Sequence, residues 1–441
     1  MNFNAKLSRK NWSVLTKPGI QSASSRLRVI VTFPFQIYPV ISGGALRGYF
    51  LLRELARHFD TVALVVNSSN EINDAIRAEL GDSLAGLSVH QIPKAAGSRS
   101  LFDRIKDRFA TFANSGSLRV PTNAVVLGTS LLLDRVIKEQ KPDVVVLTNL
   151  ESWVCSGMLK RKHPKILRII DMPNVEHILY SQQLASKGCD ASVNSEGRRL
   201  KREEGQLHRV CQGLFACSDD DSQILSELNN NKLACTTVPN GVACEHAEFD
   251  PNPEKHKHQN LLFCGTLSYP PNVDGLNWFV KEIFPLILVK HPSIRLRVVG
   301  RNFDNARFPG VSQHPSIDVI GEVSSVRPEY LQTGIAICPL RMGSGTRLKI
   351  LESMSFGSPT VSTSVGCEGI RAIDGESILI RDNAQSFADG VSQLLVSPEE
   401  FHAIRKQARR FVEANYDWKV VGNIAAKQII EWHAARNEVA V

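Results

Sequence analysis

The sequence predicts an α/β protein of two consecutive, doubly wound domains that face each other across a cleft. Short apolar runs alternate with longer amphipathic segments along almost the whole chain. The runs are continuously apolar, which is typical of parallel strands covered by helices on both faces. The alternation breaks once near residues 240–260 and then restarts. At 441 residues, the chain is long enough to bury a full core in each domain.

Six apolar runs in the first half predict the strands of the first domain. They are LRVIVTF (27–33), TVALVVN (61–67), LSVHQIP (87–93), DVVVLTN (143–149), KILRIID (165–171) and GLFACS (213–218). The break that follows is rich in Pro, Asn, Lys and His, which is typical of a linker. We therefore expect a first domain at 26–240 and a linker at 241–259.

Six further runs predict a second domain of similar size, at 260–415. They are NLLFCG (260–265), IRLRVVG (294–300), IDVIGEV (317–323), IAICP (335–339), PTVSTSV (359–365) and SILI (377–380). Ligands of doubly wound sheets bind beyond the carboxyl ends of the strands. With two such domains, the cleft between them is the expected site.

The composition is that of an ordinary soluble protein, with 43% hydrophobic and 22% charged residues. No apolar run approaches the roughly 18 residues of a membrane-spanning helix. The nine cysteines form no CxxC pair, and Cys264 and Cys338 lie inside apolar runs. Such cysteines pack as small hydrophobic residues. We expect a reducing, cytoplasmic environment and no structural zinc.

The net charge of +8 is unevenly spread, because no acidic residue precedes Glu54. Residues 1–25 lack the apolar core of a secretory signal, so they predict a flexible extension, with an organellar targeting segment as the alternative. Residues 98–119 interleave apolar and basic residues near helical spacing. They predict either peripheral contact with anionic lipid at the inner membrane face or a helix packed on its own domain. No nucleic-acid motif accompanies the charge, so no nucleic-acid partner is expected.

The densest group of candidate binding residues lies in PLRMGSGTRLKILESMSFGSP (339–359). Gly343 and Gly345 separate the run IAICP from a helix predicted over TRLKILESMSF. A helix that opens at such a turn presents free N–H groups and a positive dipole end to an anion. Three cations, Arg341, Arg347 and Lys349, lie in the same stretch. The expected guest is a phosphate or diphosphate.

A carboxylate completes this stretch. Glu352 lies one to two turns into the predicted helix, where it could accept hydrogen bonds from a sugar hydroxyl. The combination predicts a nucleotide-sugar site, and the alternative is a plain loop before a solvated helix face. A Walker A loop is excluded because Lys349 does not follow the second glycine directly. A dinucleotide fingerprint is excluded because position 348, where it needs a third glycine, is Leu.

The first half has a glycine turn of its own. Gly43 and Gly44 follow the first predicted strand and precede a predicted helix, so backbone could approach a ligand closely there. Arg47, on that helix, could steady a phosphate. The alternative is a tight strand-to-helix connection that needs small residues.

Polar residues also follow the fifth predicted strand. Asp171 ends that strand, and Glu176 and His177 follow in MPNVEH. Asp171 is a candidate general acid or hydroxyl ligand, and His177 is either catalytic or a packing residue at a helix start. No HxH, HExxH or DxD pair accompanies them, so a bound metal is not expected.

Taken together, these motifs resemble retaining GT-B glycosyltransferases of the family 4 type (glycosyl transferases group 1), over roughly residues 27 to 432. The motifs that carry the resemblance are SGGALR (42–47), DMPNVEH (171–177), VPNGV (238–242), FCGTLSYPPNVDGLNWFV (263–280), the stretch 339–369 and YDW (416–418). The resemblance implies the GT-B fold, in which a last helix, here 416–441, crosses back to the first domain.

The resemblance also implies an activity. Such a protein moves a sugar from a nucleotide-diphosphate sugar to a glycan, lipid-linked or other acceptor with retention of configuration, in polysaccharide or glycoconjugate biosynthesis. It needs no metal or other cofactor. Glu352 would bind the nucleotide ribose, and Glu368 would lie near the donor. The diphosphate would be neutralised by Arg347 and Lys349 with backbone amides of Gly343, Gly345 and Thr346, while Gly43 and Gly44 approach the donor from the first domain.

The sequence departs from the pattern of relatives in three respects. Ser344 stands where the first carboxylate of an E-x7-E motif would be, and Pro173 where relatives often have His. Thr266 and 270–272 stand where many relatives carry Arg and Lys, which shifts the phosphate contacts to Arg347 and Lys349. One alternative is a GT-B nucleotide-sugar epimerase, which shares the fold. The departures at Ser344 and Pro173 support the other alternative, a noncatalytic nucleotide-sugar-binding partner of another transferase.

Overall fold

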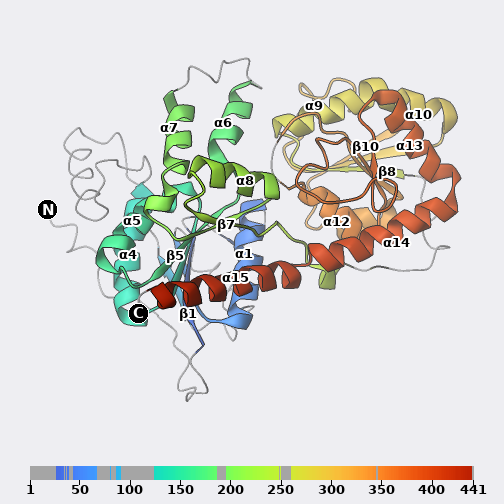
Figure 1. Cartoon of the computed structure of the whole chain (residues 1–441). Coiled ribbons are helices and arrows are strands. Elements are labelled where there is room, and N and C mark those ends of the chain that lie inside the picture. Colours follow the sequence, from blue (N-terminus) through green and yellow to red (C-terminus); the bar gives the residue numbers. More distant parts are fainter. Residues whose placement is uncertain are drawn as a thin grey trace.

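The computed structural model describes residues 26–33, 35, 37–38, 43–66, 80, 86–90, 124–185, 195–247, 249, 260–343 and 346–439. The predicted extension 1–25 and the predicted basic helix within 98–119 lie outside these residues, as do Ser344 and Gly345. The described chain forms two α/β domains, with the first in blue to green and the second in yellow to red in Figure 1. This confirms the predicted fold class.

The first sheet has seven parallel strands in the order β3-β2-β1-β4-β5-β6-β7. Their bounds are β1 Arg28–Phe33, β2 Asp60–Val66, β3 Gly86–His90, β4 Val144–Thr148, β5 Leu167–Met172, β6 Gly213–Ala216 and β7 Ala234–Thr237. Six of them match the predicted runs. The seventh, β7, was missed because it is a four-residue edge strand with the partly polar sequence ACTT. Three of its four residues are half-buried and one is exposed.

Helices cover both faces of this sheet. They are α1 Gly43–His58, α4 Ala124–Gln140, α5 Trp153–Lys162, α6 Glu176–Ala185, α7 Ser195–Glu204 and α8 Asp219–Leu228, with short 3₁₀ turns at Leu150–Ser152, Leu207–Arg209 and Cys244–His246. Neighbouring residues of β1 serve opposite faces, because Val29 and Val31 belong to the core under α1, whereas Ile30 belongs to the core under α4 and α5.

The first glycine turn differs from its prediction in one respect. Gly43 and Gly44 form the first turn of α1 and do not precede it. Both are exposed, so the start of the helix still lacks side chains. Leu51, Leu52 and Leu55 of this helix are buried against the sheet.

The second sheet has six parallel strands in the order β10-β9-β8-β11-β12-β13. The strands are β8 Asn260–Cys264, β9 Arg295–Val299, β10 Ile317–Gly321, β11 Ile335–Cys338, β12 Thr360–Ser362 and β13 Leu379–Ile380, all within predicted runs. The chain order reverses between β8 and β11, which is the topological switch point of a doubly wound sheet. A ligand is therefore expected beyond the ends of these two strands.

The helices of the second half continue into a long C-terminal helix. They are α9 Pro270–Trp278, the π-helix Phe279–Ile283, α10 Phe284–Lys290, α11 Arg327–Gln332, α12 Leu348–Phe356, α13 Ala384–Val396, α14 Pro398–Asn415 and α15 Trp418–Val439. Figure 1 shows α15 running from α14 back along the first domain. Trp418 stacks on Phe50 of α1 with ring centres 5.5 Å apart, and Trp432 stacks on Phe215 of β6. The predicted crossing helix is confirmed.

The start of the predicted linker is fixed at this crossing. The Val242 N–H donates to the Tyr416 carbonyl (2.8 Å), and the Trp418 N–H donates to the Val242 carbonyl (3.1 Å). Phe249 packs under the Arg405 guanidinium of α14. Residues 248 and 250–259 lie outside the described chain. Of the described helices, none combines the length and apolar character needed to cross a membrane.

Candidate functional site

The predicted phosphate site lies at the switch point of the second sheet. The chain leaves β11 at Cys338 and enters α12 at Leu348, with Arg347 as the residue that precedes the helix. Gly357 ends the helix in the left-handed conformation (φ 72°), which glycine adopts without steric cost. Because α12 follows β11, and β8 runs parallel beside β11, the N-terminus of α12 lies at the edge where both strands end.

Lys349 is the cation held most firmly at this edge. Its Nζ donates to the Asn272 Oδ1 (2.8 Å) and lies 4.4 Å from the centre of the Phe263 ring. Burial lowers the pKa of the Lys349 ammonium, because a charge loses hydration away from water. A side chain at Gly265 would displace this ammonium, since a Cβ there would lie 2.9 Å from Nζ. The glycine after β8 thus makes room for a lysine from α12.

Asn272 is a site residue that the sequence did not identify. It lies in the first turn of α9 and is 5% exposed. Its Nδ2 donates to the Thr266 carbonyl (2.8 Å), while its Oδ1 accepts from Lys349. The side chain therefore joins the loop after β8 to the first turn of α12. The signal in the sequence was the departure at 270–272, which places an amide near positions where many relatives have cations.

Glu352 lies one turn after Lys349 on the same helix and is half-buried. Burial raises the pKa of its carboxyl to about 7, and the Lys349 ammonium and the Tyr330 hydroxyl oppose this shift. Tyr330 is 2% exposed, donates to the Lys349 carbonyl (3.2 Å) and stacks on Phe356. A carboxyl in such surroundings gains from hydrogen-bond donors such as the hydroxyls of a ribose.

Arg347 and Glu368 face each other beside the start of α12. The nearest Arg347 and Glu368 side-chain atoms are 3.8 Å apart, with the Arg347 side chain 8% and the Glu368 side chain 49% exposed. Burial raises the pKa of Glu368, and the negative charges of Asp220 and Asp221 in the first domain raise it further. The positive charge of Arg347 lowers this pKa and so opposes the shift. The pKa of Glu368 therefore depends on charges from both domains.

The third predicted cation, Arg341, pairs with a residue of α9 and not with Glu352 or Glu368. Arg341 forms a bidentate ion pair with Asp274 of α9 (2.6 and 3.0 Å) and lies over the Trp278 ring. Arg347 and Lys349 are therefore the cations of the predicted stretch that lie at the start of α12.

The structure brings the first turn of α1 close to the start of α12. A Cβ on Gly43 would lie 3.4 Å from Cδ1 of Leu348, the first residue of α12. Thr346 Oγ1 donates across the domains to the Cys217 carbonyl (3.4 Å). An added Cβ on Gly44 meets no atom of the described chain within 4 Å. Gly343 and Thr346 lie in the loop before α12, whereas Gly345 is outside the described residues.

Arg47 and Asp171 form a buried ion pair within the first domain. Arg47 contacts both carboxylate oxygens of Asp171 (2.5 and 2.9 Å), and its other nitrogen donates to the Val238 carbonyl (2.8 Å). Their side chains are 2% and 3% exposed. Asp171 raises the pKa of Arg47 despite burial. Their expected contacts with a substrate would require this pair to open, so those roles stay predictions.

His177 is held by a carboxylate that the sequence did not single out. Its Nδ1 lies 2.5 Å from Oε2 of Glu204, while Oε1 of the same carboxylate accepts the Glu176 N–H at the start of α6 (2.6 Å). The Glu204 side chain is fully buried, and that of His177 is 15% exposed. An ionised carboxylate only accepts hydrogen bonds, so Nδ1 carries the proton and Nε2 is left for another partner. The two residues are 27 positions apart, so spacing gave no signal.

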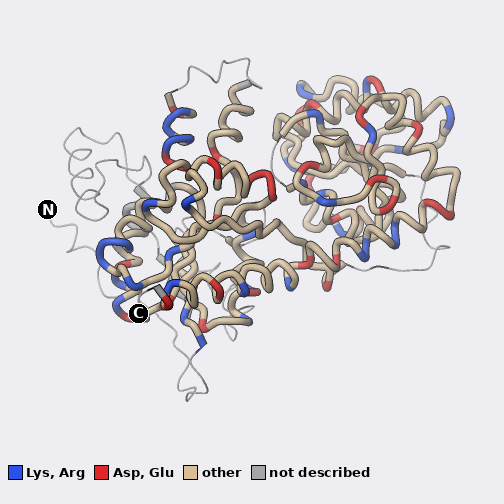
Figure 2. Tube along the Cα trace, in the orientation of Figure 1, with Lys and Arg blue, Asp and Glu red and all other residues tan. Residues whose placement is uncertain are grey.

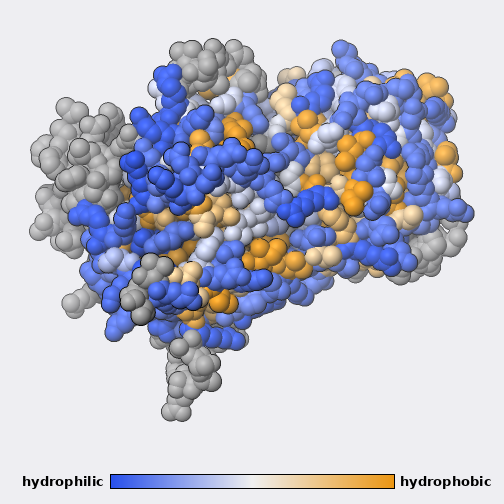
Figure 3. All heavy atoms as spheres, viewed as in Figure 1, coloured by the Kyte–Doolittle hydropathy of each residue, from blue (hydrophilic) through white to orange (hydrophobic). Residues whose placement is uncertain are grey.

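The junction of the domains carries a further hollow of about 460 Å³. Asp219 of α8 and Arg371 of the second domain form an ion pair beside it. The first turn of α8 carries three acidic residues, Asp219 to Asp221, and Figure 2 shows acidic residues at the end of this helix nearest the second domain. Apolar residues of α15, Val420 and Ile424, also line the hollow, and Figure 3 shows apolar surface along this helix near the junction.

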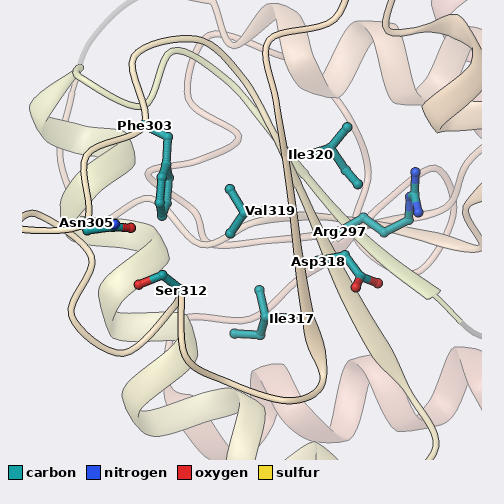
Figure 4. Close-up of a pocket in the computed structure, with 8 residues that line it drawn as sticks. All are labelled: Arg297, Phe303, Asn305, Ser312, Ile317, Asp318, Val319 and Ile320. Carbon is teal, nitrogen blue, oxygen red and sulfur yellow. The ribbon is translucent and has the colours of Figure 1, made fainter.

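A second hollow of about 630 Å³ lies on the outer edge of the second sheet, away from the switch point. Figure 4 shows Phe303, Asn305 and Ser312 on one side and Val319 of β10 on the other. Its charged residues are already paired, Arg297 with Glu329 and Asp318 with Arg295. Within the described chain, no group of three or more His, Cys, Asp or Glu side chains is placed to hold a metal.

The part of the chain that carries the switch-point site matches a known family. Residues 258–397 match the family model described as Glycosyl transferases group 1. An uncharacterized 44.6 kDa protein in the cps region of Klebsiella pneumoniae is 31% identical over 170 residues. That match covers 37% of this chain and 44% of the relative, so it spans less than half of the relative's length.

Solved structures share the whole fold. Sucrose-phosphate synthase from Thermosynechococcus elongatus superposes with a TM-score of 0.68 at 13% identity, over 93% of this chain and 100% of that one. The Anabaena protein HepE in complex with UDP-glucose gives a TM-score of 0.62 at 10% identity, over 92% and 100%. At such identities the likeness shows the fold, and the chain has the two-domain architecture of GT-B glycosyltransferases.

Proposed function

We propose that this protein is a glycosyltransferase that moves a sugar from a nucleoside-diphosphate sugar to a glycan, lipid-linked or other acceptor. The observation that carries the proposal is the arrangement of Lys349, Arg347 and Glu352 at the start of α12, beside the switch point. This is the place where doubly wound sheets bind nucleotides. It also lies in the segment that matches the glycosyl transferases group 1 model.

The charges at the switch point suit a leaving diphosphate. Lys349 and Arg347 would offset the negative charge that develops as the bond from the sugar C1 to the phosphate oxygen breaks. Glu352 would accept hydrogen bonds from the ribose. In the retaining reaction that we propose, the acceptor hydroxyl bonds to C1 on the side of the leaving group, and its proton passes to the departing phosphate oxygen. The reaction balances without a metal or another cofactor.

We propose that His177 acts from the first domain. Its Nδ1 is occupied by Glu204, so its Nε2 could accept a hydrogen bond from a hydroxyl of the sugar or the acceptor. His177 follows the carboxyl end of β5. Ligands of doubly wound sheets bind beyond the carboxyl ends of the strands, which supports a place for His177 beside the ligand on the first-domain side.

The biological setting is also a proposal. The Klebsiella relative lies in a cps region, and HepE was solved with UDP-glucose. These relatives support a nucleotide-sugar donor and a role in polysaccharide or glycoconjugate biosynthesis. We propose that the reaction takes place in the cytoplasm, with peripheral contact to the inner membrane face.

A thermal-shift screen tests the donor class. UDP-, GDP-, ADP- and dTDP-sugars are added in turn to the full-length protein, because a ligand that binds only the folded state raises the melting temperature. At a hundredfold excess over Kd, the gain is about 2.7 kcal/mol of stability. A shift with one nucleotide class, followed by release of that nucleoside diphosphate in the presence of acceptor glycans, is the expected result. If none of the nucleotide sugars or their nucleoside diphosphates shifts the transition, the proposed function is wrong.

A further inference from the structure

We propose that Asn272 is a positioning residue of the diphosphate site, which holds Lys349 through a neutral group so that the ammonium charge remains available to the phosphates. This inference rests on the proposed function, because it concerns the same ligand. It assigns a role to a residue outside the stretch 339–369 that carries the predicted cations.

The contacts of Asn272 fix two segments at once. Its Oδ1 accepts from Lys349 Nζ (2.8 Å), and its Nδ2 donates to the Thr266 carbonyl (2.8 Å). Its own backbone N–H donates to the Tyr269 carbonyl (2.9 Å), which fixes the start of α9. The side chain is nearly inaccessible to water, so both of its polar atoms depend on these partners. An apolar residue at this position would leave the Thr266 carbonyl and the ammonium without them.

The neutrality of this partner matters for the charge of the site. Asn272 and the face of the Phe263 ring hold the ammonium without cancelling its charge. A carboxylate at 272 would form an ion pair of about the same length, and a nearby opposite charge strongly offsets a cation in a half-buried site. An ammonium has three donors, so the bond to Asn272 leaves donors for an anion.

The sequence of the turn explains why this placement is needed. Between Gly265 and Asn272 the chain reads TLSYPP, which contains no cation. The end of β8 therefore contributes no charge of its own to the switch point. Lys349 reaches that end from α12 instead, over a glycine that leaves room for it, and Asn272 keeps it there.

The test compares Asn272→Asp with a matched control on the same helix. Asn277→Asp makes the same chemical change five residues later, where the half-buried Asn277 donates to the Arg307 carbonyl (2.8 Å). UDP, GDP and ADP are titrated into the wild-type protein by calorimetry. The tightest of the three and its parent nucleoside are then titrated into both variants.

We expect Asn272→Asp to weaken the nucleoside diphosphate about tenfold or more, which is about 1.4 kcal/mol, and to leave the uncharged nucleoside within about twofold. Asn277→Asp leaves both affinities unchanged. The loss is larger at low ionic strength, because salt screens the added charge. A merely structural role would weaken the nucleoside as well. If Asn272→Asp does not fold, Asn272→Ala replaces it, with its melting temperature measured. We again expect about tenfold weaker binding of the nucleoside diphosphate and an unchanged affinity for the nucleoside.

Two failures are distinguishable. If the wild-type protein binds the diphosphates no better than their nucleosides, both the proposed function and this inference are wrong. If the wild-type protein prefers the diphosphate and folded Asn272→Asp retains that preference in full, this inference alone is wrong.

Discussion

The guanidinium of Arg47 on α1 and the carboxylate of Asp171 on β5 form a bidentate ion pair whose side chains are 2% and 3% exposed. The same guanidinium donates to the Val238 carbonyl, which lies in the chain leading to the second domain. The pair therefore ties the helix that begins with the exposed glycines to a strand tip and to the domain junction. Its position indicates a structural role for Asp171 near the domain junction.

This pair predicts a large effect on stability. Removal of one partner leaves a buried charge without compensation, which costs about 3–5 kcal/mol. We expect Asp171→Ala to lower the free energy of unfolding by about this amount in urea titrations. The double variant Arg47→Met/Asp171→Leu recovers much of the loss, because a buried pair is often replaceable by apolar residues. A stable Asp171→Ala protein would contradict the structural role.

The carboxyl of Glu352 predicts a pH dependence of stability. Burial disfavours the ionised form and raises its pKa in the folded protein from the ordinary value of 4.5 to about 7. A raised pKa means that the folded state loses stability as pH rises from about 4.5 through about 7. Glu352→Gln removes this loss. Without ligand, the variant should melt above the wild type at pH 8, and the difference should shrink toward pH 5.

A constant difference between these two proteins across that range would contradict the raised pKa. Lys349→Gln, in the protein that keeps Glu352, provides a further check. Loss of the neighbouring ammonium removes a group that favours the ionised form of Glu352. The pH dependence should then move to a higher pH.

The pair of His177 and Glu204 predicts a change of tautomer. In the wild-type protein we expect the proton on Nδ1, because an ionised carboxylate at Glu204 can only accept a hydrogen bond. In Glu204→Gln the amide oxygen can still accept the Glu176 N–H, and the amide nitrogen then faces Nδ1 as a donor. We expect neutral His177 to move its proton to Nε2, which ¹⁵N NMR of the imidazole reports directly.

The neighbouring residue offers the control for this experiment. Glu203 pairs with Arg199 of the same helix (2.7 Å), so we expect Glu203→Gln to leave the tautomer of His177 unchanged. If Glu204→Gln also leaves it unchanged, the carboxylate does not orient the imidazole.

The crossing helix predicts a steric effect on stability. A Cβ on Gly422 of α15 would collide with the side chain of Glu54 on α1, which is 1% exposed. Overpacking of this kind costs about 1–3 kcal/mol. We expect Gly422→Val to lower the melting temperature by several degrees, whereas Gly310→Ala, whose Cβ would make an ordinary 3.6 Å contact, changes it little. Equal melting temperatures would show that α15 does not pack closely on α1.

The strands of both domains were predictable because they are buried on both faces and therefore read as continuous apolar runs. The edge strand β7 was not, because ACTT lies at the edge and carries little apolar signal. The start of α12 was predictable from its glycines and cations, which are adjacent in sequence.

The partners of these residues were not predictable. Asn272 and Lys349 are 77 positions apart, and Arg47 and Asp171 are 124 apart. Only the folded sheets bring such residues together. A buried carboxylate such as Glu204 also resembles any helical glutamate in the sequence, because its burial is set by the packing of α6 on α7.

The measurement that tests the account most directly is calorimetric titration of Lys349→Ala with the nucleoside diphosphate that binds the wild-type protein. Lys290→Ala, which removes an exposed ammonium paired with Asp389 in the same domain, is the control. We expect Lys349→Ala to lose at least about tenfold in affinity, or about 1.4 kcal/mol, with its melting temperature preserved and Lys290→Ala unaffected. A folded Lys349→Ala protein that binds the diphosphate as tightly as the wild type would contradict the assignment of this site.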